Sequence, residues 1–170
     1  MATRHHNISG ELTTTLLAAG DKVNVSKISL TNIHASTMCT VDLYIEKKLT
    51  GKFYLLKAVE LPVGATLIYD DTKFKTTTGE FSLYVKLTDG DTFTLTGAID
   101  PIASTTITGV GTSFLSEVSA GDEILVSSET RTVATITSDT TLTVTEATTD
   151  TANDTTPDCN PTALVDIIIN

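Results

Sequence analysis

Three histidines are the first candidates for chemistry, because a neutral imidazole can bind a metal ion or act as a general base. His5 and His6 are adjacent in MATRHHNISG and could contribute two ligands to a metal site. Their polar surroundings instead favour a solvated N-terminal arm. His34 lies in the Ser/Thr-rich stretch TNIHAST, with no recognisable nucleophile motif around it. We interpret it as a polar loop residue rather than a catalytic base.

Carboxylates are the second group of candidates. Asp70 and Asp71 could form an acid/base pair, but adjacent residues of a strand point to opposite faces, so a strand-ending turn is the better interpretation. The stretch EATTDTANDTTPD (146–158) offers oxygen ligands that calcium could use, at Glu146, Asp150, Asn153, Asp154 and Asp158. The spacing and glycine of an EF-hand are missing, so a solvated linker is favoured. We predict no catalytic, cofactor-binding or metal-binding residue, and no enzyme activity.

Composition argues against several further classes of protein. Cys39 and Cys159 match no zinc spacing and are too few for a disulfide scaffold, so we predict reduced thiols, with a disulfide between them as the alternative. The net charge of −10, without a cluster of Lys and Arg, argues against a nucleic-acid partner. The sequence contains neither a long apolar run nor an apolar N-terminal stretch, which predicts a protein that does not enter the membrane and is not exported.

Charge and threonine content divide the chain into two parts. Residues 90–158 contain eleven Asp and Glu, one basic residue and twenty Thr. Every lysine lies outside this stretch, where ten acids balance ten bases. So abrupt a shift is typical of a domain boundary. We predict a core domain formed by residues 1–89 and 159–170, with a second domain, 90–158, inserted into it.

The core domain has the period-2 pattern of strands. In TVDLYIE (40–46) and FSLYVKLT (81–88) the apolar residues alternate with polar ones, and two further strands flank the turn LPVG. In KVNVSKISLTN the apolar phase changes across Ser26 and Lys27, which predicts a β-bulge or a crossing between sheets.

The C-terminal ALVDIIIN is expected to be a half-buried strand with Ala163, Val165, Ile167 and Ile169 on the core face. We predict that it pairs within the core domain, next to FSLYVKL, so that the insertion interrupts a short hairpin. Addition of this strand to the sheet of a neighbouring subunit is the alternative.

The inserted stretch shows its own short strands, namely TFTLTG, TTITGVG, DEILVSS, TRTVATIT and TLTVTE, with one helical turn in FLSEV. The fold class predicted for the whole chain is therefore all-β: an antiparallel, jelly-roll-like β-sandwich with a second small β-barrel or sandwich inserted before the last strand.

The runs KVNVSKISLTNIHASTMCTVDLYI, FYLLKAVELPVGATLIYDD, GEFSLYVKL and ALVDIII resemble small virion structural proteins of tailed bacteriophages, particularly those of cyanobacterial phages. The insertion, from TTITGVG to TLTV, is similar to a β-module of phage tail and fibre proteins. The resemblance covers most of the chain and includes no catalytic residue. It implies a non-enzymatic virion component.

From these features we expect a capsid decoration or head–tail (neck) accessory protein that contacts other virion proteins and forms a homo-oligomer. The acidic insertion would project into solvent. The alternative is a tail or fibre-associated adhesin whose insertion binds a host receptor or glycan. The insertion has only Phe93 and Phe114 as aromatic residues, which weakens that alternative.

Overall fold

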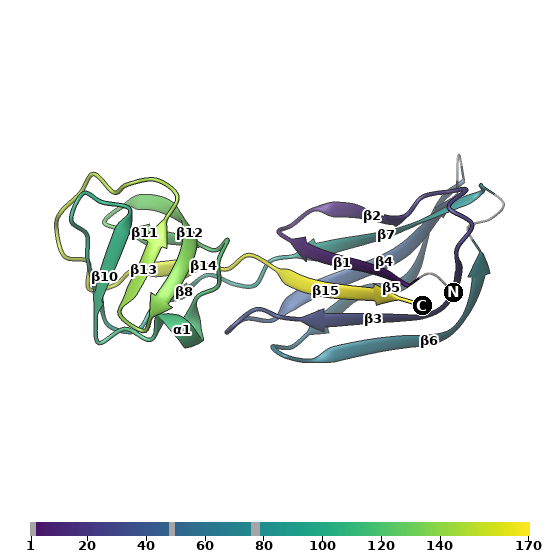
Figure 1. The fold of residues 1–170 in the computed structure, drawn as a ribbon, viewed down its shortest axis with the longest axis horizontal. Helices are drawn as coiled ribbons and strands as arrows, with labels where there is room; N and C mark the ends of the chain where they lie inside the picture. Colours follow the sequence, from purple (N-terminus) through teal and green to yellow (C-terminus); the bar gives the residue numbers. More distant parts are fainter. Residues whose placement is uncertain (1–2, 48–49, 76–78) are drawn as a thin grey trace. The chain divides into compact units, whose positions relative to one another are not determined.

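The computed structural model describes residues 3–47, 50–75 and 79–170, without the side chains of 71–75. Nearly all regular structure is β, as predicted. Contacts between residues divide the chain into two compact units (Figure 1). Unit 1 comprises residues 1–33, 38–89 and 163–170, and unit 2 comprises 34–37 and 90–162. Two short segments, 34–37 and 159–162, thus belong to unit 2, whereas the sequence had assigned both to the core domain.

Unit 1 is a sandwich of two four-stranded antiparallel sheets. Sheet A has the order β1 (Arg4–Ser9), β15 (Leu164–Ile169), β3 (Asn24–Asn32), β6 (Thr66–Lys75). Sheet B has the order β2 (Thr13–Leu17), β7 (Phe81–Thr88), β4 (Cys39–Lys47), β5 (Gly51–Leu61).

The pairing pattern of unit 1 is that of a jelly roll. Each of the first four strands pairs with one of the last four in reverse order: β1 with β15, β2 with β7, β3 with β6, and β4 with β5. A long antiparallel hairpin rolled up on itself produces this order, and eight strands in two such sheets define the jelly roll. The jelly-roll-like sandwich predicted for the core is therefore present.

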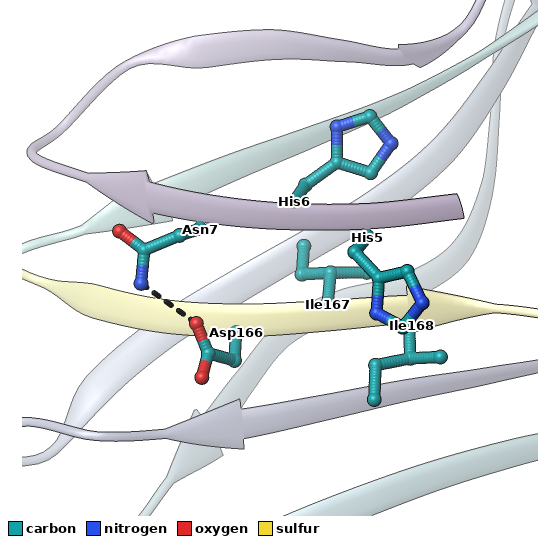
Figure 2. Close-up of a pocket in the computed structure, with 6 residues that line it drawn as sticks. All are labelled: His5, His6, Asn7, Asp166, Ile167 and Ile168. Atoms are coloured by element: carbon teal, nitrogen blue, oxygen red, sulfur yellow. Dashed lines mark hydrogen bonds between the residues drawn. The ribbon is translucent and has the colours of Figure 1, made fainter. Parts of the chain in front are cut away.

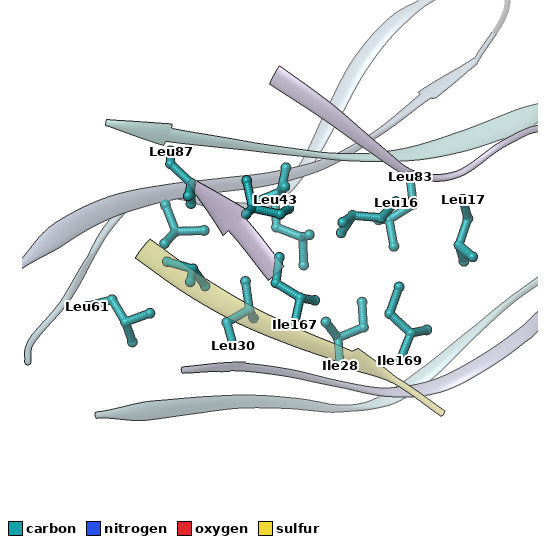
Figure 3. Close-up of a cluster of buried hydrophobic side chains, with 14 of the residues drawn as sticks. Leu16, Leu17, Ile28, Leu30, Leu43, Leu61, Leu83, Leu87, Ile167 and Ile169 are labelled. Carbon is teal, nitrogen blue, oxygen red and sulfur yellow. The ribbon is translucent and has the colours of Figure 1, made fainter. Parts of the chain in front are cut away.

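The core of unit 1 lies between the two sheets (Figure 3). Alternating residues of facing strands fill it, among them Leu30, Leu43, Leu83 and Ile167, each fully buried. The predicted core face of the last strand is confirmed, since Val165, Ile167 and Ile169 of β15 are also inaccessible to solvent. The sequence pattern therefore identified the buried face correctly.

The predicted bulge is confirmed at Ser26. The register between β3 and β6 shifts between Val25 and Lys27. The backbone N–H groups of Ser26 and Lys27 both donate to the carbonyl of Asn170, at 2.7 and 3.1 Å. Because the shift reverses the side-chain alternation, apolar residues on both sides of the bulge reach the same core.

Three expectations about unit 1 are wrong. The last strand pairs within the chain, but with β1 and β3; β7 lies in the other sheet, so the two do not form a hairpin. Residues 4–9 form an edge strand instead of a solvated arm. Asp70 and Asp71 lie inside β6, which continues to Lys75, and not at a strand-ending turn.

Unit 2 contains one seven-stranded antiparallel sheet and a single helical turn, where a small barrel or sandwich was predicted. The order is β8 (Phe93–Thr94), β14 (Asp158–Asn160), β11 (Glu123–Val126), β12 (Glu129–Ser138), β13 (Thr141–Val144), β10 (Thr106–Val110), β9 (Ala98–Asp100), with α1 at Phe114–Glu117.

The sheet of unit 2 folds over its own core. The first half of β12 pairs with β11 and the second half with β13, with a register shift after Val133. An isolated bridge joins Ile99, in the last strand of the sheet, to Asp154, just before β14 near its other end. Apolar side chains such as Phe114 and Ile124 are thereby fully enclosed. No helix among the described residues is long and apolar enough to cross a membrane.

Candidate functional site

The most concentrated chemistry in the described structure is a buried polar cluster in unit 2, centred on Asp122. This residue follows α1 at the turn into β11, and it is 0% exposed. Its carboxylate accepts hydrogen bonds from the backbone N–H of Ser119 (2.7 Å) and of Thr162 (2.9 Å). His34 Nε2 lies 3.0 and 3.1 Å from its two oxygens, and the Cys159 thiol approaches at 3.7 Å.

The hydrogen bonds of His34 identify its tautomer. Nδ1 accepts from the backbone N–H groups of Ser36 and Thr37, both at 3.1 Å, so this nitrogen carries a lone pair and no proton. The proton of the neutral ring therefore lies on Nε2 and is donated to Asp122. His34 lies in a loop, between β3 and β4, as predicted, but it is buried and both of its ring nitrogens are engaged, which the sequence did not indicate.

Two further bonds hold segment 34–37 within unit 2. The backbone N–H of Ala35 donates to Ser119 Oγ at 3.0 Å, and Ser36 Oγ donates to the carbonyl of Glu117 at 2.5 Å. The four residues therefore complete the polar interior of a unit that is otherwise continuous in sequence.

A histidine, a carboxylate and a thiol close together could suggest nucleophilic catalysis, but their arrangement does not fit that chemistry. The imidazole has no lone pair directed at the thiol, and the side chains of His34 and Asp122 are 1% and 0% exposed. Burial, followed by the charge of Asp122, raises the pKa of the Cys159 thiol far above its ordinary value. The geometry is that of a buried structural network in which each polar group has a partner.

The two N-terminal histidines lie on β1 and point to opposite faces of sheet A (Figure 2). They border a shallow depression together with Asn7, Asp166, Ile167 and Ile168. Across it, Asn7 Nδ2 donates to Asp166 Oδ1 at 2.7 Å. Because His5 and His6 diverge, they cannot chelate one ion.

The acidic stretch 146–158 packs onto unit 2, where a solvated linker was predicted. Asp154 accepts from the backbone N–H of Ser127 at 2.7 Å and of Thr156 at 2.9 Å. Asp158 opens β14 and accepts from Thr94 Oγ1 at 2.7 Å. Asp150 and Asp154 thus cap backbone N–H groups and Asp158 binds a hydroxyl, and no group of three or more metal-ligating side chains occurs among the described residues.

The outer face of sheet B carries a row of tyrosines that sequence reasoning did not single out. Tyr44 lies between Tyr54 and Tyr84, with ring centroids 5.4 Å apart on both sides. The Nζ atom of Lys52 is 4.5 Å from the centroid of Tyr44, and that of Lys57 is 4.7 Å from Tyr54. The faces of the rings are thus occupied by neighbouring rings and ammonium groups. The alternation in TVDLYIE and FSLYVKLT placed Tyr44 and Tyr84 outward, but only the β4–β7 register aligns them.

Lys57 also anchors the edge of this face. Its Nζ lies 2.6 Å from Asp42 Oδ2, and the backbone N–H of Ala58 donates to Asp42 Oδ1 at 2.7 Å. Burial alone would raise the pKa of Asp42, but these two bonds outweigh it and lower the pKa. The row is therefore an ordered surface.

Both cysteines are free thiols, as predicted, and both are buried. Cys39 begins β4 in unit 1, where burial and then the charge of Asp89 raise its pKa to about 11. Cys159 is the buried residue of β14 in unit 2. Neither is positioned as a nucleophile.

Comparisons of the chain with models of protein families, with curated proteins and with solved structures gave no match.

Proposed function

We propose that this chain is a non-enzymatic structural component of a bacteriophage virion that serves as a capsid decoration or head–tail accessory protein. The observation that carries the proposal is the architecture. An eight-stranded jelly roll holds an independently packed, strongly acidic β-unit in the connection between its last two strands. Jelly rolls form viral capsid domains as well as lectins and cupins. Because the fold alone does not distinguish these classes, the proposal also depends on the chemistry of the surface.

The surface chemistry supports a structural role. The hydrogen-bonding groups of the polar cluster of unit 2 are satisfied, and Asp150, Asp154 and Asp158 in the stretch 146–158 bind groups of their own unit. Unit 1 has balanced charge, whereas unit 2 carries the entire negative excess of the chain. Such an acidic unit on a particle surface would keep particles apart by repulsion, and a balanced unit is suited to contact with other virion proteins.

The adhesin alternative finds less support. Phe114 is fully buried, and Phe93 packs against the core of unit 2, so neither presents an open ring for a sugar to stack on. Of the tyrosines of unit 1, Tyr44 and Tyr84 stack on each other, and Tyr54, which is 45% exposed, has a lysine ammonium group over its ring. We therefore do not propose a second function.

Analysis of purified particles tests the proposal. Particles of the phage that encodes this chain should retain the protein through a density gradient, at a fixed copy number measured by quantitative mass spectrometry. Cryo-electron microscopy should then show the jelly roll in contact with the capsid or neck. Absence of the protein from purified particles, with the protein present in the infected cell, would contradict the proposal.

A further inference from the structure

The edge strand β1 is held to unit 1 from one side. It is the outermost strand of sheet A, and β15 is its one neighbour in the described sheet. The register places Arg4, His6 and Ile8 on the core side, opposite Ile169, Ile167 and Val165. Of these three, only Ile8 is buried, at 5% exposure. Most strands of this sandwich bury two or more aliphatic side chains, so β1 contributes little apolar burial of its own.

His6, the second residue of β1 that faces the core, weakens the attachment of this strand to β15. The Nε2 atom of His6 is buried and has no hydrogen-bond partner. Such an unsatisfied polar atom costs free energy that is regained when the strand leaves and the imidazole meets water. The residue opposite it on β15 is Ile167. The backbone of Leu16 on β2 favours the charged ring, but burial and Arg4 outweigh this contribution and the net pKa of His6 is lowered. The charged or titratable groups that act on it are Arg4 and His5 of its own strand.

If β1 left the sheet, it would expose the edge of β15, which could then pair with another strand. Its neighbour β15 consists of LVDIII, with Val165, Ile167 and Ile169 fully buried. Without β1, the N–H and C=O groups on one edge of this apolar strand would be unpaired, and such edges recruit another strand. The strand that fits best is another β1, because it restores the same register, the Asn7–Asp166 hydrogen bond and the burial of Ile8.

The connection after β1 provides a hinge. Gly10 has φ of 88°, a backbone conformation that glycine adopts without strain, and it lies between β1 and the start of β2. A change in the backbone angles of this residue and its neighbours would let β1 extend away from its own sheet.

We propose that β1 is an exchangeable strand: in mildly acidic solution it leaves β15 of its own chain and pairs with β15 of a second copy, giving a reciprocal, strand-swapped dimer. Exchange of an identical element is a low-cost route to a closed dimer, because each interface repeats contacts that the monomer already makes.

The direction of the pH effect follows from His6. Burial, and then the charge of Arg4, lower its pKa in the folded protein. In a released strand the pKa returns to about 6.5. Above that value the imidazole is neutral in both states, so pH has no effect. As the pH falls below about 6.5, the released strand binds the proton more tightly and release is favoured.

Mixed cross-linking tests the exchange. Ser9 and Leu164 are opposite each other on β1 and β15. One chain carries Ser9→Cys, and a second chain with a size tag carries Leu164→Cys. Equal amounts are incubated at pH 5.5 or pH 8, and both mixtures are then brought to pH 7 and treated briefly with a short bismaleimide, so that the thiolate, which is the reacting form, is equally abundant in both. The native cysteines are buried, so a mixture of chains without the two new cysteines, treated in the same way, gives the background. Only exchange places the two new thiols side by side.

We expect at least about fivefold more cross-linked heterodimer at pH 5.5 than at pH 8. His6→Leu in both chains should abolish this difference, whereas His5→Leu, at the exposed neighbour on the opposite face, should preserve it. Heterodimer that is absent at both pH values, or equal at both, would overturn the proposal. So would a pH dependence that survives His6→Leu. The test uses free protein, so its outcome is independent of the virion role.

Discussion

Replacement of Asp122 by alanine should strongly destabilise unit 2. The side chain is 0% exposed and accepts from three nitrogen donors, namely the N–H groups of Ser119 and Thr162 and the Nε2–H of His34, and also from the Cys159 thiol at 3.7 Å. Each buried donor left without a partner costs about 1–3 kcal/mol. Partial relaxation and entry of water reduce this sum to about 3–5 kcal/mol. We expect Asp122→Ala to fall in this range.

The two units can be followed separately in one sample. All four tyrosines lie in unit 1 and the chain has no tryptophan, so tyrosine fluorescence reports on unit 1. Far-UV circular dichroism reports on the strands of both units. At about 4–8 °C per kcal/mol for a domain of the size of unit 2, the loss should lower the melting temperature of this unit, followed by circular dichroism, by roughly 12–40 °C. If the units melt independently, the tyrosine signal keeps its wild-type midpoint.

The control is Glu146→Ala, which removes the same charge from an exposed position of unit 2. It should change the free energy of unfolding by less than about 0.5 kcal/mol. The double variant His34→Ala/Asp122→Ala should be less destabilised than the sum of the two single variants, because the first change already breaks the shared bond. An Asp122→Ala protein that melts within about 2 °C of wild type by both signals would refute the reasoning.

Three further outcomes are expected. Truncation after Asp166 removes two fully buried isoleucines, each worth roughly 2–5 kcal/mol by comparison with alanine, and also the Asn170 carbonyl that binds the β3 bulge; the chain should unfold or aggregate, and a cooperatively melting monomer in size-exclusion chromatography would contradict this. A thiol reagent at pH 8 should label neither Cys39, whose pKa is raised to about 11, nor Cys159 until denaturant is added; rapid labelling of the native protein would show that these sites open. Gly97→Ala should destabilise more than Gly111→Ala, by about 1–3 kcal/mol in a denaturant titration, because both have positive φ but only at Gly97 would a Cβ meet backbone, 2.5 Å from the Val110 carbonyl; equal losses would contradict the clash.

The sequence predicted which side chains are buried better than it predicted which strands are neighbours. Alternation in β7 and β15 follows from period 2 and identifies the core face directly. It does not identify a partner, because any strand with one apolar face can pair with any other. The partner of β15 is determined by how the whole hairpin rolls up. Proximity in an uninterrupted core sequence suggested β7, whereas the jelly roll places the last strand between β1 and β3.

The buried cluster escaped sequence reasoning for a related reason. Asp122 lies in SAGDE, which has the composition of a surface turn, and His34 lies 88 positions earlier in a Ser/Thr-rich loop. A carboxylate in such a turn is usually solvated. Only the fold brings together two backbone donors and an imidazole that make its burial favourable. The same applies to the tyrosine row. Tyr44, Tyr54 and Tyr84 lie far apart in the sequence and come together only through the register of β4 with β5 and β7.

The connection that carries the insertion shows why residues 159–162 were misassigned. TTPDCNP resembles a linker by composition, yet Asp158–Asn160 pair with β11 on one side and β8 on the other. A three-residue strand in that position needs one buried side chain, and Cys159 supplies it. The true return to unit 1 follows Thr162, where the N–H of Ala163 donates to Asp89 Oδ1 at 2.8 Å. That bond joins the two ends of the inserted segment. Because those ends already meet, the jelly roll can close around β15 whatever length of chain lies between them.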